Sequence, residues 1–184
     1  RKVSSLKTYY KFLLKIGDLE VSPLAKHKVL KTAKKLQVPF SEKEIDNVLE
    51  ILKEEDSFVG LRNKLIVELF YSTGIRRGEL VNLKLNDISD SQKTIKVLGK
   101  RNKERIIPLL PSVLNTIASY LECRKSLSSI KDMHYLFLTE KGAKIYETLV
   151  YRVINNYFSK ASEKVKRSPH ILRHSFATHM LNEG

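Results

Sequence analysis

The fold is decided around residues 69–80, which read LFYSTGIRRGEL. Leucines at helical spacing lead into this stretch and predict a helix over about 61–72, which Gly74 ends. A further turn or two of helix is expected at 77–82. Arg76 therefore falls in a break between two helices.

A guanidinium on such a short turn is held in place and can clamp a phosphate through two hydrogen bonds. Glu79 can orient either Arg76 or its neighbour Arg77. Both arginines could instead be ordinary surface residues, and these residues alone leave that open.

The segments on either side predict the rest of the fold. Ser41-Glu42-Lys43-Glu44 is a capping box that opens a helix. Further helices are expected at 6–16, 112–126 and 147–160, with a short extended piece at 134–139 and a short helix or linker at Lys26–Lys35. Short β-prone segments at 83–88, 94–98 and 105–109 predict an antiparallel meander. The fold class is therefore α+β, a mainly helical domain with a small three-stranded antiparallel sheet.

The last helix has a clear start, with Ser168 as its N-cap and Pro169 at its first position. His170 and Arg173 share one face of this helix with His174 beside them, next to the positive end of the helix dipole. That arrangement suits a phosphate, although the pair could merely cap or solvate the helix. Three residues on roughly the opposite face are expected to pack inward: Leu172, Phe176 and Met180.

The link between the second and third β segments is very basic. It reads Gly99-Lys100-Arg101-Asn102-Lys103-Glu104-Arg105. A hairpin tip of this kind can approach DNA, with Lys100 in it. The alternative is a solvated turn that touches only backbone phosphates.

The net charge of the chain indicates which class of partner it binds. The 184 residues hold 34 Lys and Arg against 20 Asp and Glu, a net charge of +14. This favours a polyanion, with nucleic acid first and an anionic membrane second. Residues 1–40 hold ten of the basic residues and only two acidic ones, which indicates a basic arm. The chain has no membrane-spanning run or signal-peptide pattern and no starting Met, so we expect a piece of a longer protein.

Several chemistries are disfavoured. The single cysteine, Cys123, excludes a disulfide framework and a Cys-rich zinc site. His170 and His174 have the spacing of a zinc helix, but Ile171 stands where that motif needs Glu and no third ligand is evident. The acidic residues are scattered beside lysines rather than clustered, unlike those of a metal-dependent nuclease. No glycine-rich phosphate loop indicates ATP use.

Three motifs in this order resemble the tyrosine recombinase (phage integrase) family, most closely its bacterial Xer-type members. They are residues 69–80, the Gly99–Arg105 hairpin with the following Ile106-Ile107-Pro108-Leu109, and SPHILRHSFATH at 168–179. The resemblance implies the tyrosine recombinase catalytic fold. It implies that 37–184 form the catalytic domain without its C-terminal helices, and that 1–36 are the end of an N-terminal core-binding domain with a linker.

The resemblance also implies catalytic roles. Arg76 matches the first catalytic arginine, Lys100 the hairpin lysine that protonates the leaving 5′-oxygen, and His170 and Arg173 the His-x-x-Arg pair. In the family a Tyr hydroxyl attacks a DNA phosphate and forms a 3′-phosphotyrosyl link, without metal, ATP or other cofactor. That Tyr and a second His or Trp follow the pair and are absent from this chain, so we expect this fragment alone to be inactive.

The remaining tyrosines do not replace the missing one. We expect those on helices to be core or half-buried, namely Tyr71, Tyr120, Tyr151 and Tyr157. Arg101 stands where the family often has Gly, which adds charge and affects the turn. Further DNA contacts are expected from five residues: Arg77, Arg101, Lys103, Arg105 and His174.

The implied function is site-specific DNA recombination, as integration, excision or dimer resolution. The expected partners are double-stranded DNA and further copies of the protein, with a dimer on each site and a homotetramer on two, together with an accessory or partner recombinase. The expected location is the bacterial cytoplasm, with the nucleoid. The alternative is a non-catalytic DNA-binding protein derived from an integrase. A membrane-bound basic protein is a weaker alternative, because nothing suggests a strongly hydrophobic insertion face.

Overall fold

The computed structural model describes residues 2–28, 38–162 and 167–182. The chain divides into two compact units, Arg1–Leu36 and Gln37–Gly184. In the first unit, α1 (Lys2–Ile16) ends before Gly17, as the sequence predicts. The helix or linker predicted at Lys26–Lys35 lies mostly outside the described residues.

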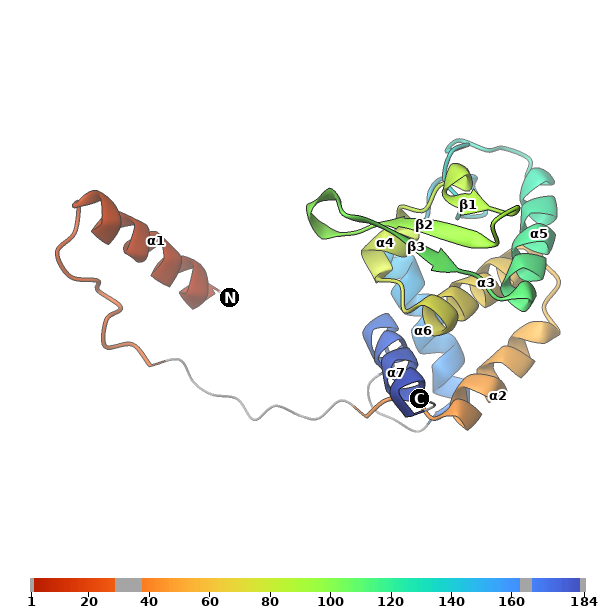
Figure 1. Ribbon diagram of the computed structural model, residues 1–184, viewed down its shortest axis with the longest axis horizontal. Coiled ribbons are helices and arrows are strands. Elements are labelled where there is room, and N and C mark those ends of the chain that lie inside the picture. Colours follow the sequence, from red (N-terminus) through yellow and green to blue (C-terminus); the bar gives the residue numbers. More distant parts are fainter. Residues whose placement is uncertain (1, 29–37, 163–166, 183–184) are drawn as a thin grey trace. The chain divides into compact units, whose positions relative to one another are not determined.

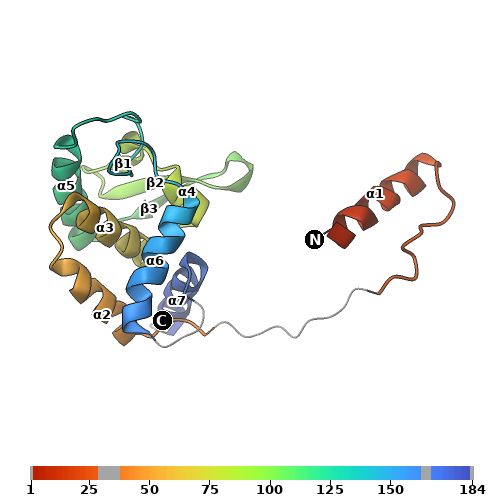
Figure 2. The ribbon, with the colours of Figure 1, turned by 180° about the vertical axis from the view of Figure 1, so that it is seen from behind.

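The second unit is built around a central helix, α3 (Phe58–Thr73), shown in Figures 1 and 2. Its buried apolar residues form part of the core. The helix packs against four other helices. These are α2 (Glu42–Lys53), α5 (Pro111–Lys125), α6 (Glu147–Ala161) and α7 (Pro169–Asn182). In the described part of the chain, no helix has the length and apolar character needed to span a bilayer.

Local caps define where these helices begin and end. The predicted capping box is present, because the Glu44 amide donates to the Ser41 hydroxyl at 3.3 Å and the Ser41 amide donates to the Glu44 carboxylate at 2.7 Å. The helix α3 begins three residues before the predicted Leu61, because the Ser57 hydroxyl caps its first turn. Gly74 ends it in the left-handed conformation, as predicted.

The sheet has three antiparallel strands in the order β1 (Ile88–Ser89), β2 (Thr94–Leu98) and β3 (Glu104–Pro108). The second and third strands match the predicted segments closely. The first prediction, a strand over 83–88, is wrong for most of its length. Leu85–Asp87 form a 3₁₀ turn, in which the Asp87 carboxylate accepts from the Lys84 amide at 2.8 Å. This local bond competes with strand pairing.

The helix α7 begins at Pro169, as predicted, and buries one side. Leu172 is fully buried, but Met180 is 57 % exposed, so its predicted inward packing is wrong. At 3.6 residues per turn, Met180 lies about 80° around the helix from Leu172. The last inward position is instead taken by His179, whose Nδ1 lies 3.1 Å from the Tyr71 hydroxyl.

Candidate active site

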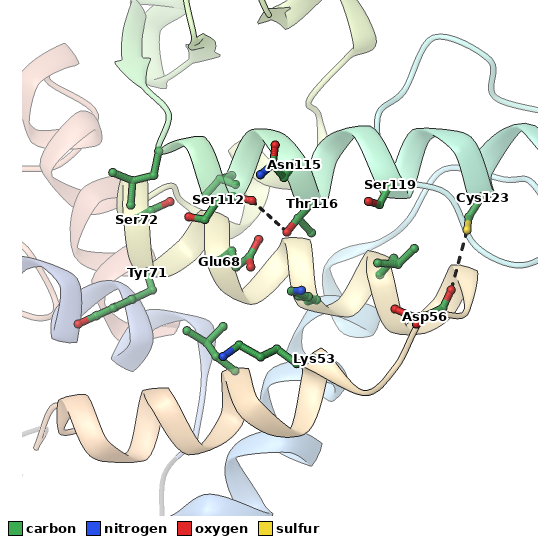
Figure 3. A pocket seen from close by; sticks show the side chains of 15 residues that line it. Lys53, Asp56, Glu68, Tyr71, Ser72, Ser112, Asn115, Thr116, Ser119 and Cys123 are labelled. Atoms are coloured by element: carbon green, nitrogen blue, oxygen red, sulfur yellow. Dashed lines mark hydrogen bonds between the residues drawn. The ribbon is translucent and has the colours of Figure 1, made fainter.

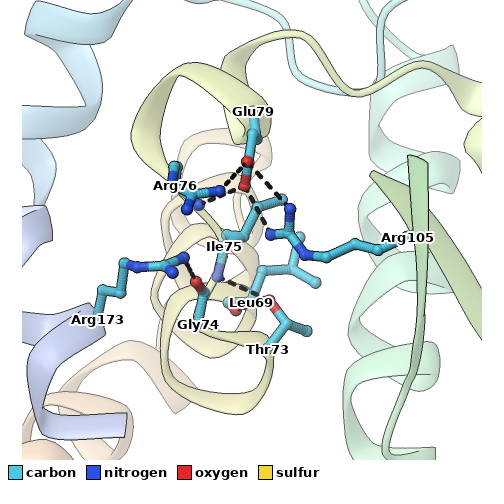
Figure 4. Close-up of polar contacts among 8 residues, drawn as sticks. All are labelled: Leu69, Thr73, Gly74, Ile75, Arg76, Glu79, Arg105 and Arg173. Carbon is cyan, nitrogen blue, oxygen red and sulfur yellow. Dashed lines mark hydrogen bonds and ion pairs between the residues drawn. The ribbon is translucent and has the colours of Figure 1, made fainter. Parts of the chain in front are cut away.

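The turn after α3 holds Arg76 in place. Gly74 has φ 55°, and a Cβ there would lie 2.5 Å from the ring of Phe176 on α7. Glycine therefore serves both the left-handed turn and the close approach of α7. Thr73 closes the turn, because its hydroxyl donates to the Leu69 carbonyl and accepts from the Ile75 amide (Figure 4).

Glu79 orients Arg76 and is shared with a second arginine. It belongs to α4 (Arg77–Val81), and it accepts from the Arg76 amide at 2.9 Å and from the Arg76 guanidinium at 2.7 Å. Arg105 on β3 donates to both carboxylate oxygens, at 3.0 and 2.7 Å (Figure 4). Burial alone would raise the pKa of Glu79, but hydrogen bonds from Arg105 and Arg76 outweigh it and lower that pKa to about 2.

Arg173 reaches the same turn from α7. Its guanidinium donates to the carbonyl oxygen of Gly74, which is 99 residues earlier in the chain (Figure 4). Burial lowers the pKa of Arg173, and so does the positive charge of Arg76, while Glu79 partly opposes the shift. The two guanidiniums are thus close enough to repel each other. A bound anion would relieve that repulsion.

The predicted residues Arg76, His170 and Arg173 line one cavity of about 610 Å³. Arg77 lines it too, but it forms an ion pair with Glu147 on α6 rather than with Glu79. The other lining residues are Phe70, Ile75, Tyr151, Ser168 and Pro169. Two guanidiniums and an imidazole on one concave surface can bind a phosphate and offset negative charge that develops on it.

The basic hairpin carries the remaining predicted residues. The backbone of Lys100 lies in η2 (Lys100–Asn102), and its side chain is outside what the structure describes. Arg101 and Lys103 are exposed, whereas Arg105 turns onto Glu79. On α7, His174 is exposed and lines a smaller cavity of about 300 Å³ with His170 and Arg173.

Two features of the site were missed by sequence reasoning. Tyr151 is 42 % exposed and lines the arginine cavity, so the prediction that it is core or half-buried is wrong. The signal was present, because Tyr151 falls off the apolar stripe of Val150, Val153 and Ile154. The Arg105–Glu79 pair spans 26 residues, and no local pattern indicates it.

A larger cavity, of about 740 Å³, opens elsewhere, between α2, α3 and α5 (Figure 3). Glu68 and Ser72 each bury an oxygen there without a hydrogen-bond partner, and burial raises the pKa of Glu68. Cys123 also lines this cavity. Arg76, His170 and Arg173, the predicted catalytic residues whose side chains the structure describes, do not line it. Within the described residues, no three His, Cys, Asp or Glu side chains gather into a possible metal site.

Comparisons with known proteins agree on one family. The model of the phage integrase family matches residues 39–184. The tyrosine recombinase XerC of Staphylococcus carnosus (strain TM300) is 40 % identical over 184 residues, which are all of this chain and 62 % of that protein.

Two solved structures are similar as well. The crystal structure of XerA recombinase is 31 % identical with a TM-score of 0.70, and the match covers 97 % of this chain and 60 % of that one. The XerH site-specific recombinase bound to palindromic difH substrate, a post-cleavage complex, is 25 % identical with a TM-score of 0.74, over 89 % and 48 %. The chain spans about three fifths of the length of the curated relatives it matches.

Proposed function

This chain belongs to the phage integrase family, and from that premise we propose that its protein cuts and rejoins duplex DNA at specific sites as a tyrosine recombinase. One observation carries the proposal: Arg76, Arg173 and His170, from two elements distant in sequence, converge on one cavity. Binding alone does not require this set, whereas in phosphoryl transfer such a set offsets the charge that develops on the phosphate oxygens. The named activities of the XerC and XerA relatives support the same function.

The proposed reaction is a transfer of one phosphoryl group between oxygens. A tyrosine hydroxyl oxygen attacks the DNA phosphorus, a phosphotyrosyl bond forms, and the bond to the 5′-oxygen breaks. Arg76 and Arg173 offset the charge that develops on the non-bridging oxygens. His170 accepts the proton of the tyrosine hydroxyl or bonds the phosphate, and Lys100 gives a proton to the departing 5′-oxygen. The 5′-hydroxyl of a partner strand then reverses the step.

We propose that the attacking tyrosine belongs to a part of the protein outside these 184 residues. In the family it follows the His-x-x-Arg pair, and no tyrosine follows Arg173 here. The relatives are longer than this chain, which supports the proposal. The fragment alone would then bind DNA without cutting it.

We also propose roles for the two units. Residues 37–184 would be the catalytic domain, and residues 1–36 the end of a DNA-binding domain with its linker. The division of the chain near residue 36 and the start of the family match at residue 39 support this assignment. Two copies would occupy each DNA site, and four would assemble for strand exchange.

Covalent capture on DNA tests the function. The full-length protein would be incubated with a library of nicked duplexes, from which the released strand diffuses away and leaves the protein attached. We expect an adduct that survives denaturation, with DNA joined to a tyrosine in the linked peptide, and its loss in Arg76→Ala. Binding without any adduct would favour the alternative of a non-catalytic DNA-binding protein.

A further inference from the structure

An ion pair ties the basic hairpin to the turn that holds Arg76. Arg105 is the second residue of β3 and lies opposite Val97 on β2. Its guanidinium forms two hydrogen bonds with Glu79, and the Glu79 side chain is almost fully buried. Because Glu79 also holds Arg76, one carboxylate joins the hairpin to the α3–α4 turn.

The base of the hairpin tip lies close to this pair. The Gly99 amide donates to the Lys103 carbonyl at 2.8 Å and closes the tip. A Cβ at Gly99 would lie 3.5 Å from both Arg105 Nη1 and Glu79 Oε1. Lys100 is the residue after Gly99, so its backbone directly follows the residue that approaches the Arg105–Glu79 pair.

The surroundings of Arg105 indicate a structural role for this residue rather than a contact with DNA. The sequence placed it among the residues that touch DNA, but its side chain is about one-third exposed and its guanidinium is paired with a buried carboxylate. The hydrogen bonds that Arg105 donates to the Glu79 carboxylate raise the pKa of Arg105, so the guanidinium stays charged. Bidentate pairs of this kind set geometry as well as energy.

We propose that Arg105 is a positioning residue, which acts through Glu79 to hold the hairpin, and with it Lys100, against the turn that carries Arg76. This inference rests on the proposed function, in which Lys100 protonates the departing 5′-oxygen. Without Arg105 the hairpin tip loses its support while Arg76 keeps its bonds to Glu79. Proton donation should suffer, and phosphate binding should persist.

A sulfur-substituted substrate separates these effects. A thiolate leaves without needing a proton, so a duplex with sulfur in place of the bridging 5′-oxygen bypasses the general acid. In the full-length protein, we expect Arg105→Ala to slow cleavage of the oxygen substrate about 10- to 100-fold. On the sulfur substrate its rate should return to within about threefold of wild type, as for Lys100→Ala.

Matched variants sharpen the comparison. Lys96→Ala removes an exposed ion pair with Glu104 on the same hairpin and should leave both rates unchanged. Arg173→Ala should stay slow on both substrates. Arg105→Lys keeps one charged bond to Glu79 and should give an intermediate oxygen rate, which keeps the test decisive if the alanine variant unfolds.

The outcomes distinguish the two proposals. If Arg105→Ala or Arg105→Lys is slowed equally on both substrates, or on neither, the positioning role is wrong while the recombinase proposal stands. If wild type cleaves neither substrate, the proposed function itself fails. The inference is supported if the Arg105→Ala variant regains its cleavage rate on the sulfur substrate only, while its DNA affinity stays within about threefold of wild type.

Discussion

Glu79 accepts two hydrogen bonds from Arg76, one from its backbone amide at 2.9 Å and one from its guanidinium at 2.7 Å. The first bond caps α4, and the second aims the side chain. About half of the Arg76 side chain stays exposed, so the guanidinium is oriented and still open to a ligand. An arginine restrained in this way loses little freedom when it binds a phosphate.

The shifted pKa of Glu79 predicts how stability depends on pH. The folded state lowers this pKa from 4.5 to about 2, so Glu79 stabilises the fold fully above about pH 5. That stabilisation, on the order of 3 kcal/mol, is lost as the pH falls toward 2. Urea unfolding between pH 6 and pH 2 should therefore show a steeper loss for wild type than for Glu79→Gln.

The control for this titration is Glu122→Gln, which changes an exposed carboxylate paired with Lys125. It should follow the wild-type curve. Equal pH dependence in wild type and Glu79→Gln would show that the two arginines do not stabilise the ionised form.

Arg101 adopts a backbone conformation that suits glycine. Its φ is 60°, and left-handed geometry costs a residue with a Cβ about 1 kcal/mol. We expect Arg101→Gly to raise the midpoint of thermal unfolding by a few degrees. Arg101→Ala removes the same charge but keeps the Cβ, so it should give no such gain. A gain in both variants would point to charge repulsion instead.

Because the hairpin tip is exposed and basic, we expect it to contribute salt-dependent binding to DNA. Lys103→Ala should weaken binding to any duplex and reduce the slope of log K against log salt concentration by about 1. Fluorescence anisotropy between 50 and 300 mM salt measures both. Lys125→Ala removes an exposed lysine from α5 and should leave the slope unchanged. An unchanged slope in Lys103→Ala would remove the hairpin tip from the interface.

A variant of Tyr151 tests which tyrosine is the attacking nucleophile. It is the tyrosine that lines the arginine cavity among the residues described by the structure, yet we assign the attack to a tyrosine after Arg173. Tyr151→Phe should therefore still form the covalent adduct in the full-length protein. Complete loss of the adduct, with the fold and DNA affinity intact, would make Tyr151 the attacking residue.

Much of the fold could be read from the sequence, because its signals are local. The Ser41–Glu44 capping box, the Gly74 stop and the start of α7 at Pro169 each depend on residues within one turn. The prediction of a strand over 83–88 was wrong, and the cause is again a local interaction. A local bond between Asp87 and the Lys84 amide overrode its β-prone pattern.

The site was only partly predictable. Helical spacing correctly put His170 and Arg173 side by side, because both belong to one helix turn. The meeting of Arg173 with Gly74, and of Arg105 with Glu79, depends on how distant elements pack. Packing of that kind leaves no periodic trace in the sequence, so the shared role of Glu79 emerged only from the structure.

The central claim is that the arginine cluster performs chemistry rather than mere binding, and Arg173→Ala tests it most directly. Adduct formation and DNA affinity would be measured on the same nicked duplex, with Thr178→Ala on the same helix as the control. We predict that Arg173→Ala cuts adduct formation by at least about 10²-fold while affinity falls less than tenfold. If adduct formation and DNA affinity fell by the same factor, the claim would be contradicted, because Arg173 would then only bind the DNA.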